Sequence, residues 1–186
     1  QLIDSFRWDF LAKPTTPKMM MDLTRDRPSW TVSKDAGGRS ACDASTRADA
    51  GTVFEGNLVP PLDHSQTGIS PKAYCAIRTE IPRQMRDVHG YEGLEMKVRF
   101  ADDNVYAVNL TAKSFFPDDL YQGFLRRPSD ASDDDDDDDD GPWTKVVLPF
   151  EQFVLTSYGD EKAVQRDLNT DALQTLGITV MSERET

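Results

Sequence analysis

The segment from Leu94 to Phe100 alternates strictly between apolar and charged residues. The apolar positions are Leu94, Met96, Val98 and Phe100, and each residue between them carries a charge. Because successive side chains of a β-strand point to opposite faces, this period of two predicts a strand with one face in a core and the other in water. Such a strand is typical of one layer of an antiparallel sandwich.

Similar short apolar segments recur along the chain, separated by turn-forming residues. They span 52–58, 74–79, 105–110, 120–125, 143–150 and 173–180. Because no long amphipathic helical pattern lies between them, the sequence disfavours a parallel α/β sheet and predicts an all-β fold, an antiparallel β-sandwich or jelly roll. The turn formers at 101–104 further predict a hairpin over 94–110. The stretch 151–170 is expected to be loop with one helical turn.

The negative charge of the chain is concentrated in one place. The net charge is −12, and eight acidic residues form the run from Asp133 to Asp140, without which the remainder carries −4. An acidic chain repels phosphate backbones, which disfavours a nucleic-acid partner and docking on an anionic membrane through a basic patch. Charges this dense cannot be buried, so the acidic insert at about 127–142 is expected to be solvated and disordered. Weak divalent-cation binding, or competition for a basic partner surface, is the alternative role for the run.

Residues that could carry chemistry are few. The histidines, His64 and His89, have no second histidine or cysteine at ligand spacing, and no phosphate-binding glycine loop, nucleophile elbow or Cys-x-x-Cys motif occurs. We therefore expect no catalytic residue, no metal and no cofactor. An enzyme with a carboxylate-based site is one functional hypothesis, although no pair of carboxylates stands out. Cys42 and Cys75 could form a disulfide, but two small buried thiols are the favoured interpretation.

One N-glycosylation pattern occurs, at Asn109-Leu110-Thr111. It lies within a predicted strand, where Asn109 shares a face with Val105 and Ala107. We interpret Asn109 as a polar residue of a sheet face.

Eight segments, taken in order, resemble the motifs of the CIA30 family. They span 30–40, 53–56, 74–78, 91–99, 104–110, 121–122, 143–153 and 176–178. The resemblance runs from about Trp30 to Val180, and the ordered set is more specific than any one segment. The motif residues that it implies to be structural are Trp30, Asp35, Gly37, Gly38, Ser40, Gly93, Trp143, Pro149 and Phe150.

The resemblance implies a galactose-binding-like jelly roll and a non-enzymatic role. Members of the family are chaperone-like assembly factors for mitochondrial complex I, the NADH:ubiquinone oxidoreductase. They bind membrane-arm intermediates and other assembly factors on the matrix side of the inner membrane, so the same partners and location are expected here. The expected organisation is a lead-in with an early strand over 1–29 and one sandwich domain over 30–186.

The large aromatic residues and the motif glycines receive structural roles. Trp30, Trp143, Phe150 and Phe153 are expected to fill the core of the sandwich or its ends. The motif glycines Gly37, Gly38 and Gly93 are expected to serve turns with positive φ.

Arg78, Tyr121 and Gln122 are the candidate residues for partner binding. Arg78 alternates with Ala76 and Tyr74 and is therefore expected on one sheet face. If Tyr121 and Gln122 lie beside it, the three would form a recognition patch.

A carbohydrate-binding module of the same fold is the alternative function. Such modules stack sugar rings on exposed aromatic side chains. Burial of Trp8, Trp30 and Trp143 together would remove that platform.

Overall fold

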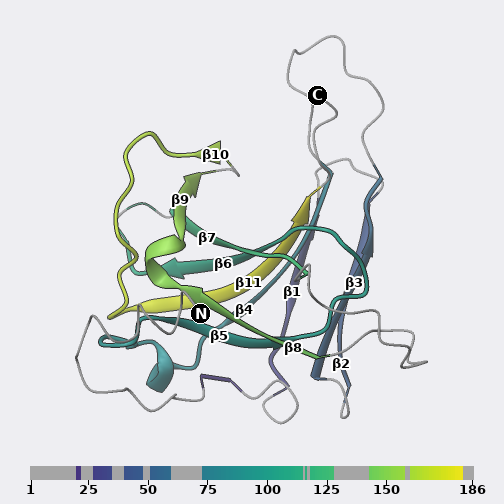
Figure 1. Cartoon of the computed structure of the whole chain (residues 1–186), viewed down its shortest axis with the longest axis horizontal. Helices are drawn as coiled ribbons and strands as arrows, with labels where there is room; N and C mark the ends of the chain where they lie inside the picture. Colours follow the sequence, from purple (N-terminus) through teal and green to yellow (C-terminus); the bar gives the residue numbers. More distant parts are fainter. Residues whose placement is uncertain are drawn as a thin grey trace.

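The computed structural model describes residues 20–21, 27–34, 40–47, 51–59, 73–114, 116, 118–127, 143–157 and 160–181. Almost all regular structure in these ranges is β-strand, which confirms the predicted all-β class (Figure 1). Several predictions lie outside the described residues. They concern the early strand, Trp8, Asp35, Gly37, Gly38, His64 and the acidic insert beyond Arg127.

One layer is a seven-stranded antiparallel sheet. In spatial order its strands are β1 (Thr31–Lys34), β4 (Tyr74–Glu80), β11 (Leu173–Met181), β6 (Tyr106–Ala112), β7 (Leu120–Leu125), β9 (Val154–Ser157) and β10 (Asp160–Glu161). The central strands β4, β11 and β6 therefore come from distant parts of the chain. In Figure 1 this sheet runs from β1 on the right to β9 and β10 at the upper left.

The second layer consists of two separate two-stranded sheets. Its strands are β2 (Ala41–Arg47) with β3 (Gly51–Asn57), and β5 (Gly93–Val98) with β8 (Thr144–Pro149). Two 3₁₀ turns, η1 (Arg83–Met85) and η2 (Phe150–Gln152), complete the regular structure of the described ranges. The β2–β3 pair stands beside β1, whereas β5 and β8 cross below β4 (Figure 1).

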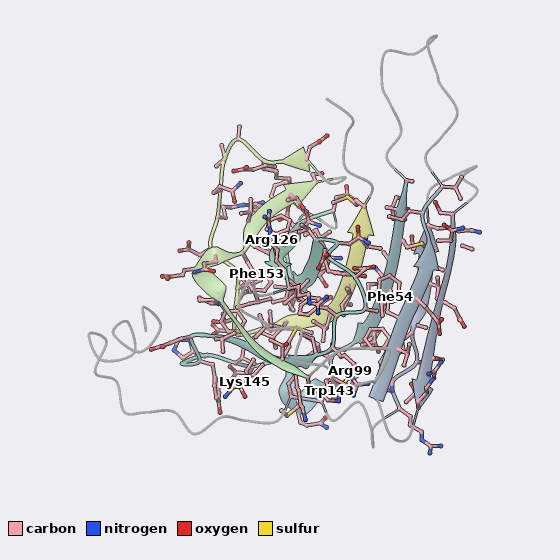
Figure 2. All side chains as sticks on the ribbon, turned by 45° about the vertical axis from the view of Figure 1, so that its right-hand side comes forward. Phe54, Arg99, Arg126, Trp143, Lys145 and Phe153 are labelled. Carbon is pink, nitrogen blue, oxygen red and sulfur yellow. A yellow bond between two sulfur atoms is a disulfide. The ribbon has the colours of Figure 1, made fainter. Side chains whose placement is uncertain are left out.

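The core lies between the large sheet and the β5–β8 pair. From the large sheet it takes Val108, Leu110, Tyr121, Leu125, Leu155, Leu173 and Leu176, and from the facing layer Leu94 and Leu148. Met96 and Val98 pack against this cluster and Phe100 is buried in it, so the predicted inward face of the alternating segment is confirmed. Phe153 is also buried, as expected, and points into the interior (Figure 2).

The predicted hairpin over 94–110 is wrong. Strand β5 pairs with β8, and β6 pairs with β11 and β7. The turn at 101–104 therefore carries the chain from one layer to the other instead of joining neighbours. The alternation of β5 indicates which of its faces is buried, but it does not identify the neighbouring strand. Strand β8, with Val146 and Leu148, has the same apolar pattern and is the strand that pairs with β5.

Some strands, among them β9 and β2, lie in segments that the sequence did not assign to strands. Strand β9 lies in the stretch expected to be loop, and it pairs with β7 through Tyr121 and Leu155. Its four residues are too few to display a period of two. Strand β2 is built largely from small and polar residues, which carry little strand signal.

Gly93 does not occupy a turn, and positive φ is not its role. It lies in β5 opposite Pro149, and a Cβ atom at this position would lie 2.5 Å from the carbonyl oxygen of Leu148. The motif glycine is therefore required for close approach of two strands.

The expectation of two separate thiols is also wrong. Cys42 of β2 and Cys75 of β4 form a disulfide, with their Cα atoms 5.8 Å apart. Cys75 lies on the core face of the large sheet, at the place where the β2–β3 pair covers it. The bond therefore joins the two layers covalently.

Breaking this disulfide should destabilise the fold. The bridged residues are 33 positions apart, and a loop of this size corresponds to about 3–4 kcal/mol of stabilisation in the chain-entropy view. Denaturant unfolding with and without a thiol reductant measures the effect. The Cys42→Ser, Cys75→Ser double variant is the control, since its midpoint should not respond to reductant; equal midpoints for oxidised and reduced wild type would refute the expectation.

Candidate binding face

The face of the large sheet opposite the core carries polar and small side chains. One register row crosses four strands through Arg78, Gly177, Asn109 and Gln122. Residues of such a row point to the same side of a sheet. We call this side the polar face.

A ladder of side-chain hydrogen bonds runs along the middle of the polar face. The Gln122 Nε2 donates to Asn109 Oδ1 at 2.9 Å, and Asn109 Nδ2 donates to Thr179 Oγ1 at 2.6 Å. All three residues are buried, so these bonds satisfy groups that would otherwise be costly to bury. Asn109 is therefore a polar residue of a sheet face, as interpreted from the sequence.

A pocket of about 570 Å³ opens at one end of the polar face. Its lining includes Thr31, Arg78, Glu80, Thr111, Lys113 and Thr175. Phe116 and Asp119, from the connection between β6 and β7, also line it. The pocket is thus framed by the edge strand β1, the central strands β4, β11 and β6, and one loop.

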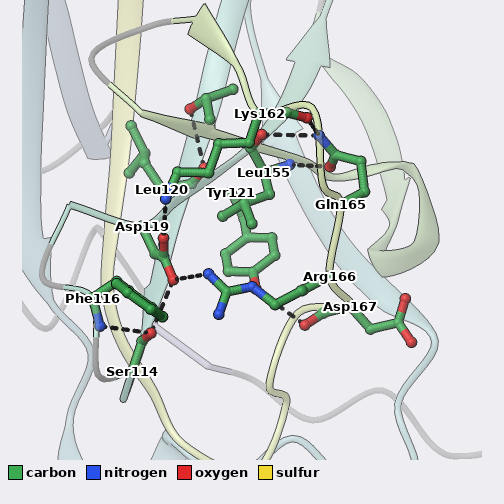
Figure 3. A network of polar contacts seen from close by, with 11 residues as sticks. Ser114, Phe116, Asp119, Leu120, Tyr121, Leu155, Lys162, Gln165, Arg166 and Asp167 are labelled. Carbon is green, nitrogen blue, oxygen red and sulfur yellow. Dashed lines mark hydrogen bonds and ion pairs between the residues drawn. The ribbon is translucent and has the colours of Figure 1, made fainter.

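Asp119 is the centre of the polar network beside this pocket (Figure 3). Its carboxylate accepts hydrogen bonds from Ser114 Oγ at 2.9 Å, Lys162 Nζ at 2.6 Å and Arg166 Nη2 at 2.8 Å. Both cations also lie over the Phe116 ring, with Arg166 4.8 Å from its centroid. The network fixes the loop after β10 to the loop before β7.

The ionisation of Asp119 reflects two opposed effects. Burial would raise the pKa of its carboxyl group, but hydrogen bonds from Lys162 and Ser114 and the nearby positive charges outweigh it. The pKa of Asp119 therefore lies below its ordinary value. The carboxylate is a charged acceptor of three hydrogen bonds, unlike a general acid, whose pKa is raised.

Gln165 fastens the same loop to strand β9 in the manner of a neighbouring strand. The N–H of Leu155 donates to Gln165 Oε1 at 2.7 Å, and Gln165 Nε2 donates to the Leu155 carbonyl at 3.1 Å (Figure 3). This side-chain pairing continues the edge beyond the short strand β10. It adds a second anchor to the loop whose Lys162 and Arg166 bind Asp119.

The predicted patch of Arg78, Tyr121 and Gln122 does not form. Tyr121 points into the core because it adjoins Gln122 in β7, and adjacent residues of a strand face opposite ways. Gln122 shares the polar face with Arg78, but their strands are three strand spacings apart, a total of roughly 14 Å. The side-chain amide of Gln122 is also engaged in the hydrogen-bond ladder. Of the three residues, only Arg78 is exposed.

The motif residues in the described ranges have mixed placements. Trp30 is partly buried, and its Nε1 donates to Thr52 Oγ1 at 3.1 Å. Ser40 is fully buried and accepts a hydrogen bond from the backbone N–H of Val59. Pro149 ends β8, and Phe150 begins the 3₁₀ turn with its ring 6.2 Å from that of Phe153.

Trp143 does not fill the core. Its side chain lies on the outer side of the β5–β8 layer, where the residue is 39% exposed, and the Arg99 guanidinium lies 4.9 Å from the ring centroid (Figure 2). Lys97 Nζ lies 5.2 Å from the same centroid. Trp143 lies two residues before the exposed Lys145, so it shares the outward side with Lys145, whereas Val146 and Leu148 face the core.

Several residues of the polar face escaped the sequence analysis. The signal was present, because Asn109 and Thr111 in one segment and Thr175 and Thr179 in another alternate with apolar residues. Two such central strands indicate a sheet face that is not part of the apolar core. Phe124 lies on this face too, opposite Ala107, and is 49% exposed. The partners of Asp119 gave no signal, because Lys162 and Arg166 belong to a stretch without periodicity.

The described part of the chain holds neither a metal-binding cluster nor a membrane-spanning helix. Within it, no three His, Cys, Asp or Glu side chains are grouped so that they could hold a metal ion. None of its helical segments is long and apolar enough to cross a membrane.

Comparison with known protein families shows to which family the chain belongs. A family model described as complex I intermediate-associated protein 30 (CIA30) matches residues 19–186, nearly the whole chain. The chain belongs to the CIA30 family. This confirms the resemblance of the ordered segments, and membership supports a role related to complex I assembly.

Solved structures with a similar fold are carbohydrate-binding modules. The CIA30 chain is similar to the family 11 module of the cellulosomal cellulase Lic26A-Cel5E of Clostridium thermocellum, with 12% identity, a TM-score of 0.57, and 92% of this chain and 99% of that chain covered. It is also similar to a family 11 module from Clostridium thermocellum in complex with a β-1,3-1,4-mixed-linked tetrasaccharide, with 11% identity, a TM-score of 0.51, and 88% and 91% covered. At such identity the likeness shows the fold alone, and it confirms the jelly-roll sandwich.

Neutralising Asp119 should destabilise the CIA30 chain in a pH-dependent way. We expect Asp119→Asn to cost roughly 2 kcal/mol at neutral pH, because hydrogen bonds to a buried charge are lost. Since the pKa of Asp119 is lowered on folding, this contribution is complete above the ordinary carboxyl pKa and declines as the pH falls through the lower folded pKa.

Chemical denaturation of wild type and variant between about pH 2 and pH 7 measures that difference. Asp118→Asn is the matched control, since Asp118 is an exposed neighbour. A stability difference that is independent of pH would contradict an electrostatic role for Asp119.

Proposed function

We infer that this CIA30 domain is a non-enzymatic assembly factor that binds an intermediate of complex I through protein–protein contacts. The observation that carries the inference is the family match over residues 19–186. The inferred partners are membrane-arm subunits and other assembly factors, and the inferred location is the matrix side of the mitochondrial inner membrane.

The polar face is the best candidate for the contact surface. Its centre is held by the buried hydrogen-bond ladder, which favours a surface already ordered before a partner arrives. Phe124 is an exposed aromatic side chain on it, and aromatic residues are enriched among the side chains that dominate binding energy. The pocket lies on the same face.

In the mitochondrial matrix, the disulfide would be exposed to a reducing environment. Disulfides are rare in compartments that keep thiols reduced, so the Cys42–Cys75 bond would have to resist reduction there. Cys75 is fully buried, which limits the access of thiols to it.

Carbohydrate binding is the second candidate function. Trp143 is not buried, so the aromatic platform that a sugar would need is not removed. Arg99 and Lys97 lie over its ring, however, and would compete with a sugar for stacking. The assembly role is therefore favoured.

Replacing Phe124 should weaken capture of the complex I intermediate. In cells that lack the endogenous gene, we expect tagged wild type to co-purify membrane-arm subunits and to restore complex I, and Phe124→Ala to recover roughly tenfold less of those subunits. Quantitative mass spectrometry measures the amount of these subunits in the eluates of tagged wild type and of Phe124→Ala in parallel.

Trp143→Ala is the matched control, since it removes an exposed aromatic ring from the other layer. If only Trp143→Ala loses the subunits, the contact surface lies on that layer. If complex I is normal in cells without the gene, the proposed function fails altogether.

A further inference from the structure

The two acidic residues of the pocket are already neutralised. The Glu80 carboxylate lies 3.1 Å from Arg86 Nη2. Asp119 is bound by Lys162 at 2.6 Å and Arg166 at 2.8 Å. Neither acid therefore gives the pocket an unbalanced negative charge.

The two basic residues in the lining are in the opposite situation. Arg78 and Lys113 are both exposed, and within the described ranges the structure places no hydrogen-bond acceptor or carboxylate against either side chain. Both lie on the polar face, because Lys113 follows Thr111 by two residues at the end of β6. Two strand spacings, roughly 10 Å, separate their strands.

Hydroxyl groups lie between these two cations. The Thr111 and Thr175 Oγ1 atoms are 2.6 Å apart and share one hydrogen bond. A hydroxyl pair that shares one bond keeps a second hydrogen that can be donated outward. Thr31, the cross-strand neighbour of Arg78, adds another hydroxyl to the lining.

We propose that this pocket binds the carboxylate of an acidic side chain on the partner protein, with Arg78 as the main donor and Lys113 as the second cation. A guanidinium can donate two parallel hydrogen bonds to one carboxylate, and the threonine hydroxyls can donate to the same oxygens. The proposal rests on the proposed function, since it names the chemical group that this face would recognise on an assembly partner.

A carboxylate fits the pocket better than a phosphate or a neutral sugar does. Phosphate sites commonly use backbone N–H groups at a helix N-terminus or in a glycine-rich loop, whereas the strands β4, β11 and β6 on the pocket floor use theirs in the sheet. Because the two acids are already paired with cations, Arg78 and Lys113 leave the pocket with an excess of positive charge, which a neutral sugar would not use.

Titration of the purified full chain with a capped acidic peptide tests the proposal. The probe is acetyl-Gly-Glu-Glu-Gly-amide, and the isosteric acetyl-Gly-Gln-Gln-Gly-amide is the neutral comparison. Amide and Arg side-chain NMR shifts report the contacts. We expect saturable shifts at Arg78, Thr111 and Thr175 with the acidic peptide, and binding at least roughly tenfold weaker with the neutral one.

Matched variants separate the pocket from general charge. Arg78→Met should weaken acidic-peptide binding at least roughly tenfold, and Lys113→Met roughly threefold. Arg47→Met should leave it unchanged, since Arg47 lies on β2 and pairs with Glu55 at 3.6 Å. Added salt should weaken binding by wild type.

Three results of the titration would overturn the proposal. The first is equal binding of the two peptides, and the second is full binding by Arg78→Met. The third is binding of inorganic phosphate or of a β-1,3-1,4-linked tetrasaccharide at these residues without binding of the acidic peptide. If the Arg78→Met, Lys113→Met double variant still co-purifies complex I subunits at the wild-type level, this inference fails while the proposed function stands.

Discussion

The structure depends on the rule that each residue of a strand faces only one side of its sheet. In β6, Val108 and Leu110 point into the core while Ala107 and Asn109 point to the polar face, and all four are buried. A central strand of this kind must therefore satisfy two different environments at once. On the polar side, Asn109 is satisfied by its hydrogen bonds with Gln122 and Thr179. Without them, the buried amide would have no partner in place of water, and the fold would be destabilised.

The two strand pairs of the second layer are not connected to each other, and each is held to the large sheet by different interactions. The β5–β8 pair contributes Leu94 and Leu148 to the main core and is held by apolar burial. The β2–β3 pair contributes no residue to that cluster. It is attached instead by the Cys42–Cys75 bond and by the edge-on contact of Phe54 with Tyr106, so a covalent link supplies part of what a small core cannot.

Local patterns in the sequence predicted the strands well and their pairing poorly. Seven predicted segments became strands, because alternation reports the environment of each side chain within one segment. The false hairpin over 94–110 arose because alternation does not say which strand lies alongside. The candidate site shows the same limit: the placement of Arg78 followed from its alternation with Ala76, whereas the pocket needed Lys113 and Thr175, which only the sheet order brings near it.

The distribution of paired and unpaired charges around the pocket decides which chemistry this face can perform. A carboxylate that acts as a general acid must carry a proton near neutral pH, but Asp119 accepts three hydrogen bonds and its pKa is lowered, so its protonation would weaken the whole network. Its partners are fixed in turn by the Phe116 ring. What the pocket can offer an incoming group is therefore hydrogen-bond donation from Arg78 and from the threonine hydroxyls, which suits a group that accepts hydrogen bonds.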